Sequence, residues 1–198
     1  MQVVIATRNK GKLGEMRKLL AGLDLELIGM GCFDIDDIPE DGSTFAENAM
    51  IKARTVHAHT GLASLADDSG LTVQALGGVP GIYSARYSGP GANDERNNLK
   101  LLQDMINVPD NQRQAAFHCC IAICLPGQDC RSFEGIWPGR ILRVPRGRNG
   151  FGYDPLFLDP ELNLSAAEMD FQTKNKRSHR ARAIQKFIDL WPALANSI

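Results

Sequence analysis

Blocks of apolar residues, separated by polar segments, predict alternating strands and helices from the start of the chain. Residues 3–6 form a short apolar run typical of a strand. After a polar segment, apolar residues at helical spacing (Leu13, Met16, Leu19 and Leu20) predict a helix that stops at Gly22. Residues 25–30 predict the next strand. A strand, a polar loop and a helix in this order begin an α/β unit.

A second helix is expected from Thr44 to about His59. Thr44 and Glu47 have the spacing of a capping box, in which each side chain bonds a free backbone amide of the first turn. One face of this helix carries a polar stripe: Asn48, Lys52, Thr55 and His59. The stripe indicates either a solvated face or a face from which Asn48 and Lys52 reach one ligand.

The remaining apolar segments predict more strands and two more helices. Strands are expected over residues 62–66, 71–76, 115–125 and 131–137, the third being apolar on both faces, as in a central strand. One helix is expected after Asn93, with an apolar side of Leu99, Leu102, Met105 and Ile106. The closing helix carries Ile184, Phe187, Ile188 and Trp191. Because strands and helices alternate unevenly, we expect an α/β fold with a mixed sheet, as a single domain over residues 1–198.

Composition narrows the class of protein. The 198 residues include 22 Lys plus Arg and 23 Asp plus Glu, a net charge of −1, which gives no reason to expect a general nucleic-acid binder. The longest nearly apolar run, residues 115–125, is shorter than the roughly 20 residues of a membrane-spanning helix. The first residues lack the pattern of a secretory signal. A cytoplasmic protein without a membrane partner is expected.

The five cysteines are Cys32, Cys119, Cys120, Cys124 and Cys130. Cys120 and Cys124 loosely fit the spacing of zinc ligands, but they lie in a predicted buried strand. Reduced, buried thiols are therefore expected.

Residues 7–12, Thr-Arg-Asn-Lys-Gly-Lys, join the first strand to the first helix. A polar loop that enters a helix presents free backbone amides and the positive end of the helix dipole, which favours a bound phosphate. The segment is not a P-loop, because Ala6 and Leu13 stand where that motif needs Gly and Ser or Thr. The alternative is a solvated turn.

Two adjacent carboxylates, Asp67 and Asp68, follow a predicted strand. Ionised together near a core, they need a cation beside them, and Mg²⁺ prefers such oxygen ligands. A carboxylate there could also take a proton from an attacking water. The alternative is an exposed acidic turn of Asp-Asp-Ser-Gly.

A basic run near the C-terminus contains Lys174, Lys176, Arg177, Arg180 and Arg182. It predicts a solvated helix face, an RNA-contact patch or, together with the aromatic residues Phe151 and Tyr153, a site that holds a nucleotide base. The spacing does not decide between these.

Eight collinear motifs over residues 7–180 resemble the inosine triphosphate pyrophosphatase family, in particular its bacterial members that act on dITP and XTP. In order they are TRNKGK (7–12), GSTFAENA (42–49), ADDSGL (66–71), GGVPGIYSARYSG (77–89), FHC (117–119), WPG (137–139), GFGYDP (150–155) and SHR (178–180). The resemblance implies an α/β fold with a long mixed central sheet, flanking helices and two lobes with a central cleft. It also implies a homodimer and Mg²⁺-dependent hydrolysis of ITP, dITP, XTP and dXTP to the monophosphate and pyrophosphate, which removes them from the nucleotide pool.

The same resemblance implies roles for individual residues. The triphosphate-binding loop is Thr7, Arg8, Asn9, Lys10, Gly11 and Lys12, with Arg8 at a variable position. Asp68 matches the catalytic acid, which also serves the metal; Lys52 and Ser69 match substrate contacts. Glu40 matches a metal ligand, although Asp41 and Asp67 remain alternatives. The residues that match the base-recognition segments of the family are Phe151, Gly152, Tyr153, Asp154, Lys174, His179 and Arg180. Two other functions stay open: a pyrophosphatase for other modified nucleotides, and a non-catalytic RNA-binding module.

Overall fold

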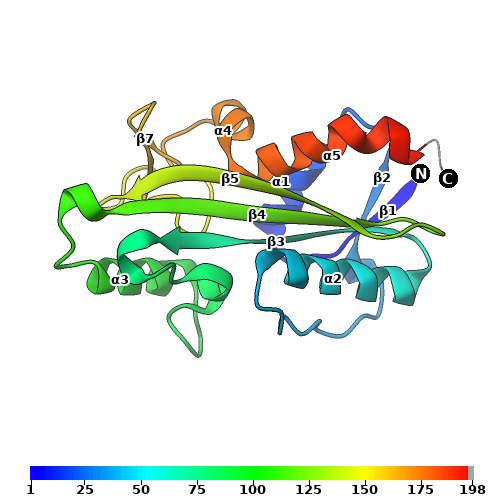
Figure 1. The fold of residues 1–198 in the computed structure, drawn as a ribbon, viewed down its shortest axis with the longest axis horizontal. Coiled ribbons are helices and arrows are strands. Elements are labelled where there is room, and N and C mark those ends of the chain that lie inside the picture. Colours follow the sequence, from blue (N-terminus) through cyan, green and yellow to red (C-terminus); the bar gives the residue numbers. More distant parts are fainter. Residues whose placement is uncertain (196–198) are drawn as a thin grey trace. The chain divides into compact units, whose positions relative to one another are not determined.

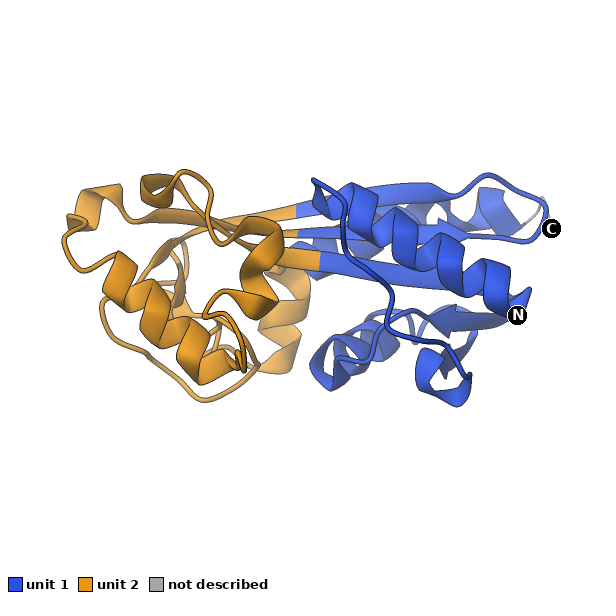
Figure 2. Ribbon diagram, turned by 90° about the horizontal axis from the view of Figure 1, so that it is seen from below, with its two compact units in different colours: residues 1–68, 119–135, 179–198 blue, residues 69–118, 136–178 orange. Residues whose placement is uncertain are grey.

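The computed structural model describes residues 1–195 and divides the chain into two compact units (Figure 2). Unit 1 consists of Met1–Asp68, Cys119–Gly135 and the described chain from His179 onward. Unit 2 consists of Ser69–His118 and Ile136–Ser178. In the described residues, no helix is long and apolar enough to cross a bilayer.

The sheet has seven strands in the order β2-β1-β3-β4-β5-β6-β7. Their bounds are β1 Gln2–Ile5, β2 Glu26–Gly29, β3 Ala63–Val73, β4 Gln114–Cys124, β5 Arg131–Ile141, β6 Phe157–Asp159 and β7 Leu164–Ser165. β1 pairs in parallel with β2 and β3, whereas β6 pairs antiparallel with β5 and β7. The predicted mixed sheet is therefore confirmed.

Five α-helices and four short 3₁₀ helices complete the described chain. The α-helices are α1 Lys10–Leu19, α2 Phe45–Thr60, α3 Asp94–Asp104, α4 Phe171–Arg177 and α5 His179–Ala195. The 3₁₀ helices are η1 Met30–Cys32, η2 Gln74–Leu76, η3 Gly81–Arg86 and η4 Asp110–Gln112.

In unit 1, helices cover both faces of the sheet: α1 and α5 lie on one face and α2 on the other (Figure 1). Successive residues of a strand point to opposite faces. Leu65 of β3 accordingly packs with Met16 and Phe187 of α1 and α5, while Ala66 packs with Ala53 of α2. Two separate apolar clusters result, and together they hold the strands of this unit between the helices.

The connections of unit 1 place a site at the carboxyl end of β1. The chain runs from β1 through α1 to β2, and from β2 through α2 to β3, so β2 and β3 flank β1 on opposite sides. Ligands of open parallel sheets bind where such connections diverge. The backbone amide of Ala6 donates to the carbonyl of Leu65 at 2.8 Å. The segment after β1 therefore starts beside residues 66–68 of β3.

The start of α2 agrees with the predicted cap. The Glu47 amide donates to Thr44 Oγ1 at 3.1 Å, and the Ser43 amide donates to the Glu47 carboxylate at 2.6 Å. The carboxylate thus reaches the residue before the cap instead of Thr44 itself. The first contact satisfies an amide that the helix leaves without a carbonyl partner, and the second ties the residue before the cap to the first turn.

In unit 2, the core is built around the rings of Phe117, Trp137 and Phe157. The centroids of Phe117 and Phe157 are 4.4 Å apart, and those of Trp137 and Phe157 are 4.9 Å apart. Buried Asp159 accepts the indole N–H of Trp137 at 3.0 Å, which satisfies both polar groups. This unit also carries α4 and β7, which the sequence pattern did not predict.

The buried side of α3 differs from the expected one. Leu101 and Met105 are fully buried, whereas Leu99 and Ile106 are 54% and 69% exposed. The expectation that Leu99 and Ile106 face the core is therefore wrong. Leu101 lies four residues before Met105 and shares its face, and this pair packs with Leu71 of β3.

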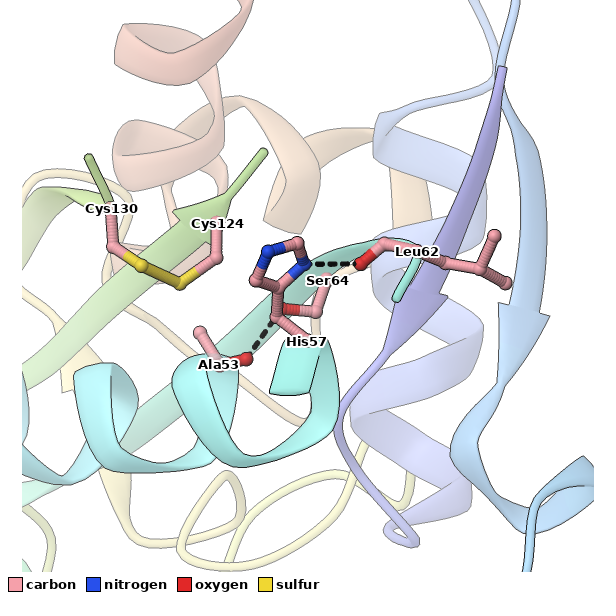
Figure 3. Close-up of a disulfide and its surroundings, with 6 residues drawn as sticks. All are labelled: Ala53, His57, Leu62, Ser64, Cys124 and Cys130. Carbon is pink, nitrogen blue, oxygen red and sulfur yellow. Dashed lines mark hydrogen bonds between the residues drawn. A yellow bond between two sulfur atoms is a disulfide. The ribbon is translucent and has the colours of Figure 1, made fainter. Parts of the chain in front are cut away.

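The expectation that all cysteines are reduced is also wrong, because Cys124 and Cys130 form a disulfide (Figure 3). The two residues end β4 and precede β5, and the antiparallel turn brings their Cα atoms to 4.2 Å. Cys32, Cys119 and Cys120 carry free thiols. Sequence spacing alone did not reveal the pairing, since it depends on the turn between the strands.

Reduction of this disulfide is expected to destabilise the protein moderately. A cross-link with a sequence separation of 6 closes a short loop, for which chain entropy predicts about 2 kcal/mol of unfolding free energy. We expect a reductant to lower Tm by about 4–8 °C, as measured by circular dichroism. The Cys130→Ser variant is the control, because its Tm should not respond to reductant. An unchanged Tm of the native protein would contradict the prediction.

Candidate functional site

The adjacent carboxylates Asp67 and Asp68 lie inside β3 and not in a turn after it. Neither side chain is exposed beyond 7%, so the interpretation as an exposed acidic turn is wrong. Because consecutive strand residues point in opposite directions, the two carboxylates point away from each other. Each finds its own cations, on helices that cover different faces.

Asp67 points toward α1 and α5 and is completely buried. Its carboxylate accepts from Lys12 Nζ at 2.6 Å, from Arg180 Nε at 2.8 Å and from the thiol of Cys119 at 3.0 Å. Burial alone would raise the pKa of Asp67, but Arg180 and Lys12 hold that pKa well below its usual range. Asp67 is therefore ionised and serves to hold two cations in place.

Asp68 points toward α2, which carries the buried side chain of Lys52. Lys52 Nζ donates to Asp68 Oδ1 at 2.7 Å, to Glu40 Oε1 at 2.9 Å and to the backbone carbonyl of Asp67 at 2.7 Å. Burial works to lower the pKa of Lys52, but Asp68 and Glu40 outweigh it and raise that pKa. The ammonium is thus charged and links the two carboxylates.

The pKa of Asp68 is shifted in the direction that suits a base. Burial raises the pKa of this carboxyl above its ordinary value, and it does so against Lys52 and Lys12, which act to lower the pKa. A higher pKa gives the carboxylate more affinity for a proton. Asp67 and Asp68, although adjacent in sequence, therefore have opposite pKa shifts and different chemistry.

The loop of residues 7–12 is ordered by local hydrogen bonds at the start of α1. Asn9 is the N-cap, and its side chain accepts from the Lys12 amide at 3.1 Å. Thr7 Oγ1 accepts from the Asn9 amide at 3.2 Å. Lys12 is directed into the cluster by its ion pair with Asp67, whereas Lys10 is exposed. The predicted loop and the acidic pair are thus neighbours within unit 1.

Gly42 and Asn48 set the path of the segment that carries Glu40. The Gly42 amide donates to Asn48 Oδ1 at 2.8 Å, and a Cβ at Gly42 would lie only 2.7 Å from that oxygen. A side chain at position 42 would therefore push the segment away. Asn48 and Lys52 are the buried half of the predicted polar stripe, and the later half is solvated at Thr55 and His59.

The carboxylates of Glu40 and Asp68 could bind a divalent ion whose other ligands come from the substrate and water. In residues 1–195, no three side chains of His, Cys, Asp or Glu are grouped as a complete metal site. Glu40 and Asp68, however, both contact one ammonium nitrogen, so they are within reach of a single cation. Mg²⁺ is commonly held by one or two carboxylates together with substrate phosphates and water. Asp67 fits this role less well, because its carboxylate is committed to Lys12 and Arg180.

Unit 2 contains a second polar cluster, formed by Phe151, Asp154 and Lys174. Lys174 Nζ donates to Asp154 Oδ2 at 2.5 Å and lies 5.1 Å from the centre of the Phe151 ring. Asp154 also accepts from the Phe151 amide at 2.9 Å. Gly150 has φ +77°, and a Cβ there would lie 1.9 Å from Asp154. Glycine is therefore required for this turn.

The other predicted base-recognition residues of unit 2 have structural contacts. Gly152 donates its amide to Asp94 at 2.7 Å, which ties the loop to α3. Tyr153 is buried, and its hydroxyl donates to the Ser84 carbonyl at 2.8 Å. Ser69, the first residue of this unit, is partly buried in β3. Tyr153 thus contributes to packing, while the Phe151 ring is only partly buried.

His179 and Arg180 lie in unit 1, at the start of α5. Both are buried, and Arg180 is held by Asp67 and by an ion pair with Glu15. The pKa of Arg180 is raised, since these carboxylates outweigh the effect of burial. Sequence reasoning missed Glu15, although its position one helical turn after Lys12 places it on the same face of α1.

Contacts of the basic run argue against an RNA-contact patch. Lys174, Arg177 and Arg180 form ion pairs with carboxylates of their own unit, and two of the three are buried. Lys176 and Arg182 are exposed. The run therefore does not present a continuous positive face, and Ser178 divides it between α4 and α5.

The protein has a mixed sheet flanked by helices. Lysines and carboxylates are grouped where β1 ends and where β3 carries Asp67 and Asp68. This combination matches a known class of proteins. The Ham1 family model matches residues 3–190, and the chain belongs to this family. It is 51% identical to a dITP/XTP pyrophosphatase of Xanthomonas axonopodis pv. citri over 185 residues, which is 92% of this chain and 93% of that protein. It is 52% identical to a dITP/XTP pyrophosphatase of Geobacter sulfurreducens, with 92% of each chain covered.

Solved structures give the same family. A HAM1 protein from Coxiella burnetii superimposes with a TM-score of 0.89 at 44% identity, covering 98% of this chain and 99% of that one. A nucleoside-triphosphatase, dITP/XTP pyrophosphatase, from Mycobacterium abscessus has a TM-score of 0.77 at 41% identity, covering 94% of this chain and 98% of that one. The predicted family and fold class are thereby confirmed.

Proposed function

We propose that this protein hydrolyses the non-standard purine nucleoside triphosphates ITP, dITP, XTP and dXTP to the monophosphate and pyrophosphate. Such a reaction removes these nucleotides before they enter DNA or RNA. The observation that supports it best is a pair of lysines at adjacent carboxylates, Lys12 at Asp67 and Lys52 at Asp68 and Glu40, in a chain half identical to dITP/XTP pyrophosphatases.

The two lysines are suited to bind the triphosphate. A triphosphate carries about four negative charges near neutral pH, which positioned ammonium groups and backbone amides offset. Lys12 and the free amides at the start of α1 would hold phosphate oxygens, with Thr7 and Asn9 keeping the loop in shape. Lys52 would bind the phosphate next to Asp68.

Asp68 is the proposed general base. Its carboxylate would take the proton of a water that attacks the α-phosphorus, while the bond from this phosphorus to the oxygen of the leaving pyrophosphate breaks. Lys12 and Lys52 then offset the charge of the pyrophosphate. Asp67 would not react, because it is buried and neutralised by Lys12 and Arg180.

Mg²⁺ is the proposed cofactor, with Glu40 and Asp68 as its protein ligands. Bound there, the ion would offset phosphate charge and make water more acidic. Lys52 donates to both carboxylates in this structure, so it would give up part of these contacts when the ion and the phosphates enter.

Base selection is proposed to involve Phe151, Lys174, His179 and Arg180. The partly buried Phe151 ring offers a stacking surface, and Lys174 Nζ is a donor suited to the oxygen at C6 of hypoxanthine or xanthine. Adenine has an amino group at this position and would be disfavoured. Arg180 could donate to a base only by leaving one of its two carboxylates.

The proposal includes a cytoplasmic homodimer, as implied by the family resemblance. Size-exclusion chromatography with light scattering tests the dimer. A mass of one chain, about half the expected value, would refute that part of the proposal without touching the proposed chemistry.

Product analysis tests the proposed reaction directly. With Mg²⁺ present, ITP, dITP and XTP should release pyrophosphate and the monophosphate, and kcat/KM should exceed that for ATP and GTP by at least about tenfold. Pyrophosphate is measured by a coupled assay and monophosphate by chromatography. Release of single phosphates would refute the reaction, and equal rates on ATP and GTP would refute the substrate class. Faster turnover of a modified pyrimidine triphosphate would favour the alternative substrate.

A further inference from the structure

We propose that Arg8 is a positioning residue that fixes the segment 33–43, and with it the carboxylate of Glu40. The inference rests on the proposed function, since it assigns Arg8 a part in forming the Glu40–Lys52–Asp68 group. It differs from the role implied by the motif, in which every residue of the loop 7–12 binds the triphosphate.

The guanidinium of Arg8 contacts the segment 33–43 at two points. Arg8 Nη2 donates to the carbonyl of Ile35, and Arg8 Nη1 forms an ion pair with Asp37. Ile35 is only 6% exposed and packs in the apolar cluster between the sheet and α2. Arg8 therefore joins the loop after β1 to a point of the segment that is already anchored in the core.

The segment itself has no helix or strand to hold its shape. The Phe33 amide donates to the Met30 carbonyl at its start, and the Gly42 amide donates to Asn48 at its end. Glu40 lies between these ends and reaches Lys52 with its side chain. A contact at Ile35 and Asp37 shortens the free span before Glu40 and so restricts where that carboxylate can lie.

Arginine suits this task better than lysine would. The planar guanidinium has several donors in a fixed fork, so one side chain can bond a carbonyl and a carboxylate at once. A lysine at position 8 could contact Asp37 but would hold both acceptors less well. The ion pair with Asp37 is exposed, at 52% for Arg8 and 92% for Asp37, so the expected effects are modest.

The test compares Arg8→Ala, Asp37→Ala and the double variant. Hydrogen exchange of a peptide that covers residues 33–43, followed by mass spectrometry without nucleotide, should be about threefold faster in Arg8→Ala and detectably faster in Asp37→Ala. Exchange in the double variant should be no faster than in Arg8→Ala, because Arg8→Ala already removes the ion pair that Asp37→Ala breaks. Arg8→Lys should recover part of the protection.

A second readout follows Glu40 itself. Titration of the nucleotide-free protein with Mn²⁺, observed by electron paramagnetic resonance, should show about threefold weaker binding in both single variants. The matched control is Arg143→Ala, which breaks the exposed Arg143–Asp110 pair of unit 2 and should change neither the exchange nor the Mn²⁺ affinity.

Two outcomes would overturn the inference. One is unchanged exchange of the segment in Arg8→Ala. The other is weaker nucleotide binding in Arg8→Ala with no change in Asp37→Ala, since Arg8 would then be a phosphate ligand. Neither exchange nor Mn²⁺ binding depends on turnover, so failure of the proposed reaction would be visible separately, as a lack of pyrophosphate release by the native protein.

Discussion

Asp68→Asn is expected to lower kcat for ITP by at least about 10²-fold, because the amide cannot take a proton from the attacking water. The fold should persist. Lys52 keeps its hydrogen bonds to Glu40 and to the Asp67 carbonyl, and the new side chain has nearly the same volume. The measurement is pyrophosphate release at saturating ITP and Mg²⁺, with circular dichroism as a check of the fold.

Asp104→Asn provides the matched control for Asp68→Asn. Asp104 also pairs with a lysine, Lys100, at 2.9 Å, but it lies on α3 outside the candidate site. The same exchange there should leave kcat within about twofold, as for most surface changes. An Asp68→Asn variant that keeps the native rate would remove Asp68 from its proposed role.

The acid side of the pH profile gives an independent check of Asp68. Only the ionised carboxylate can act as a base, so kcat/KM should fall as the pH drops below the pKa of Asp68. Because burial raises that pKa in the metal-free protein, the fall should begin above the ordinary aspartate value of about 3.9 when Mg²⁺ is limiting, and should move to lower pH as Mg²⁺ saturates its proposed ligand Asp68. This fall in kcat/KM at low pH should be absent from the residual activity of Asp68→Asn. If the variant shows the same fall at the same pH, the titrating group is not Asp68.

Much of the fold could be predicted because its signals are local. The cap at Thr44 and Glu47 and the apolar strand β4 are each encoded within a few residues, and the structure agrees with both. The continuity of β3 through Asp67 and Asp68 could not be predicted in this way. Those carboxylates can be buried within a strand only because cations from three helices neutralise them.

The partners within the site are the part that sequence patterns leave open. Arg180 forms an ion pair with Asp67, which is 113 residues away in the sequence, and Arg8 forms one with Asp37, which is 29 residues away. Neither pairing has a spacing rule, since both depend on how the helices pack against the sheet. The motif resemblance placed the residues in one site, but it did not indicate that Arg180 and Arg8 hold other protein groups.

Asp67→Asn is expected to cost about 3 kcal/mol of unfolding free energy, in contrast to its neighbour. The change leaves the partly buried charge of Lys12 and the buried charge of Arg180 with less compensation, and breaking a buried ion pair from one side is strongly destabilising. Urea unfolding in metal-free buffer at pH 7 measures the loss. Asp68→Asn is the matched control and should lose no more than about 1 kcal/mol, because Lys52 keeps Glu40 as a counter-ion and because burial, which raises the pKa of Asp68, already disfavours the charge of that carboxylate in the folded protein.

The pH dependence of this stability identifies its electrostatic origin. Arg180 and Lys12 hold the pKa of folded Asp67 well below the value of about 3.9 expected in the unfolded chain. The unfolded chain therefore binds this proton first as the pH falls, so the stabilisation is complete above about pH 5 and is lost progressively below about pH 4. The amide of the Asp67→Asn variant cannot titrate, so unfolding free energies of this variant between pH 5 and 3 should decline less steeply than those of the native protein. Equal slopes would mean that Asp67 stabilises the fold by packing or hydrogen bonding and not through its charge.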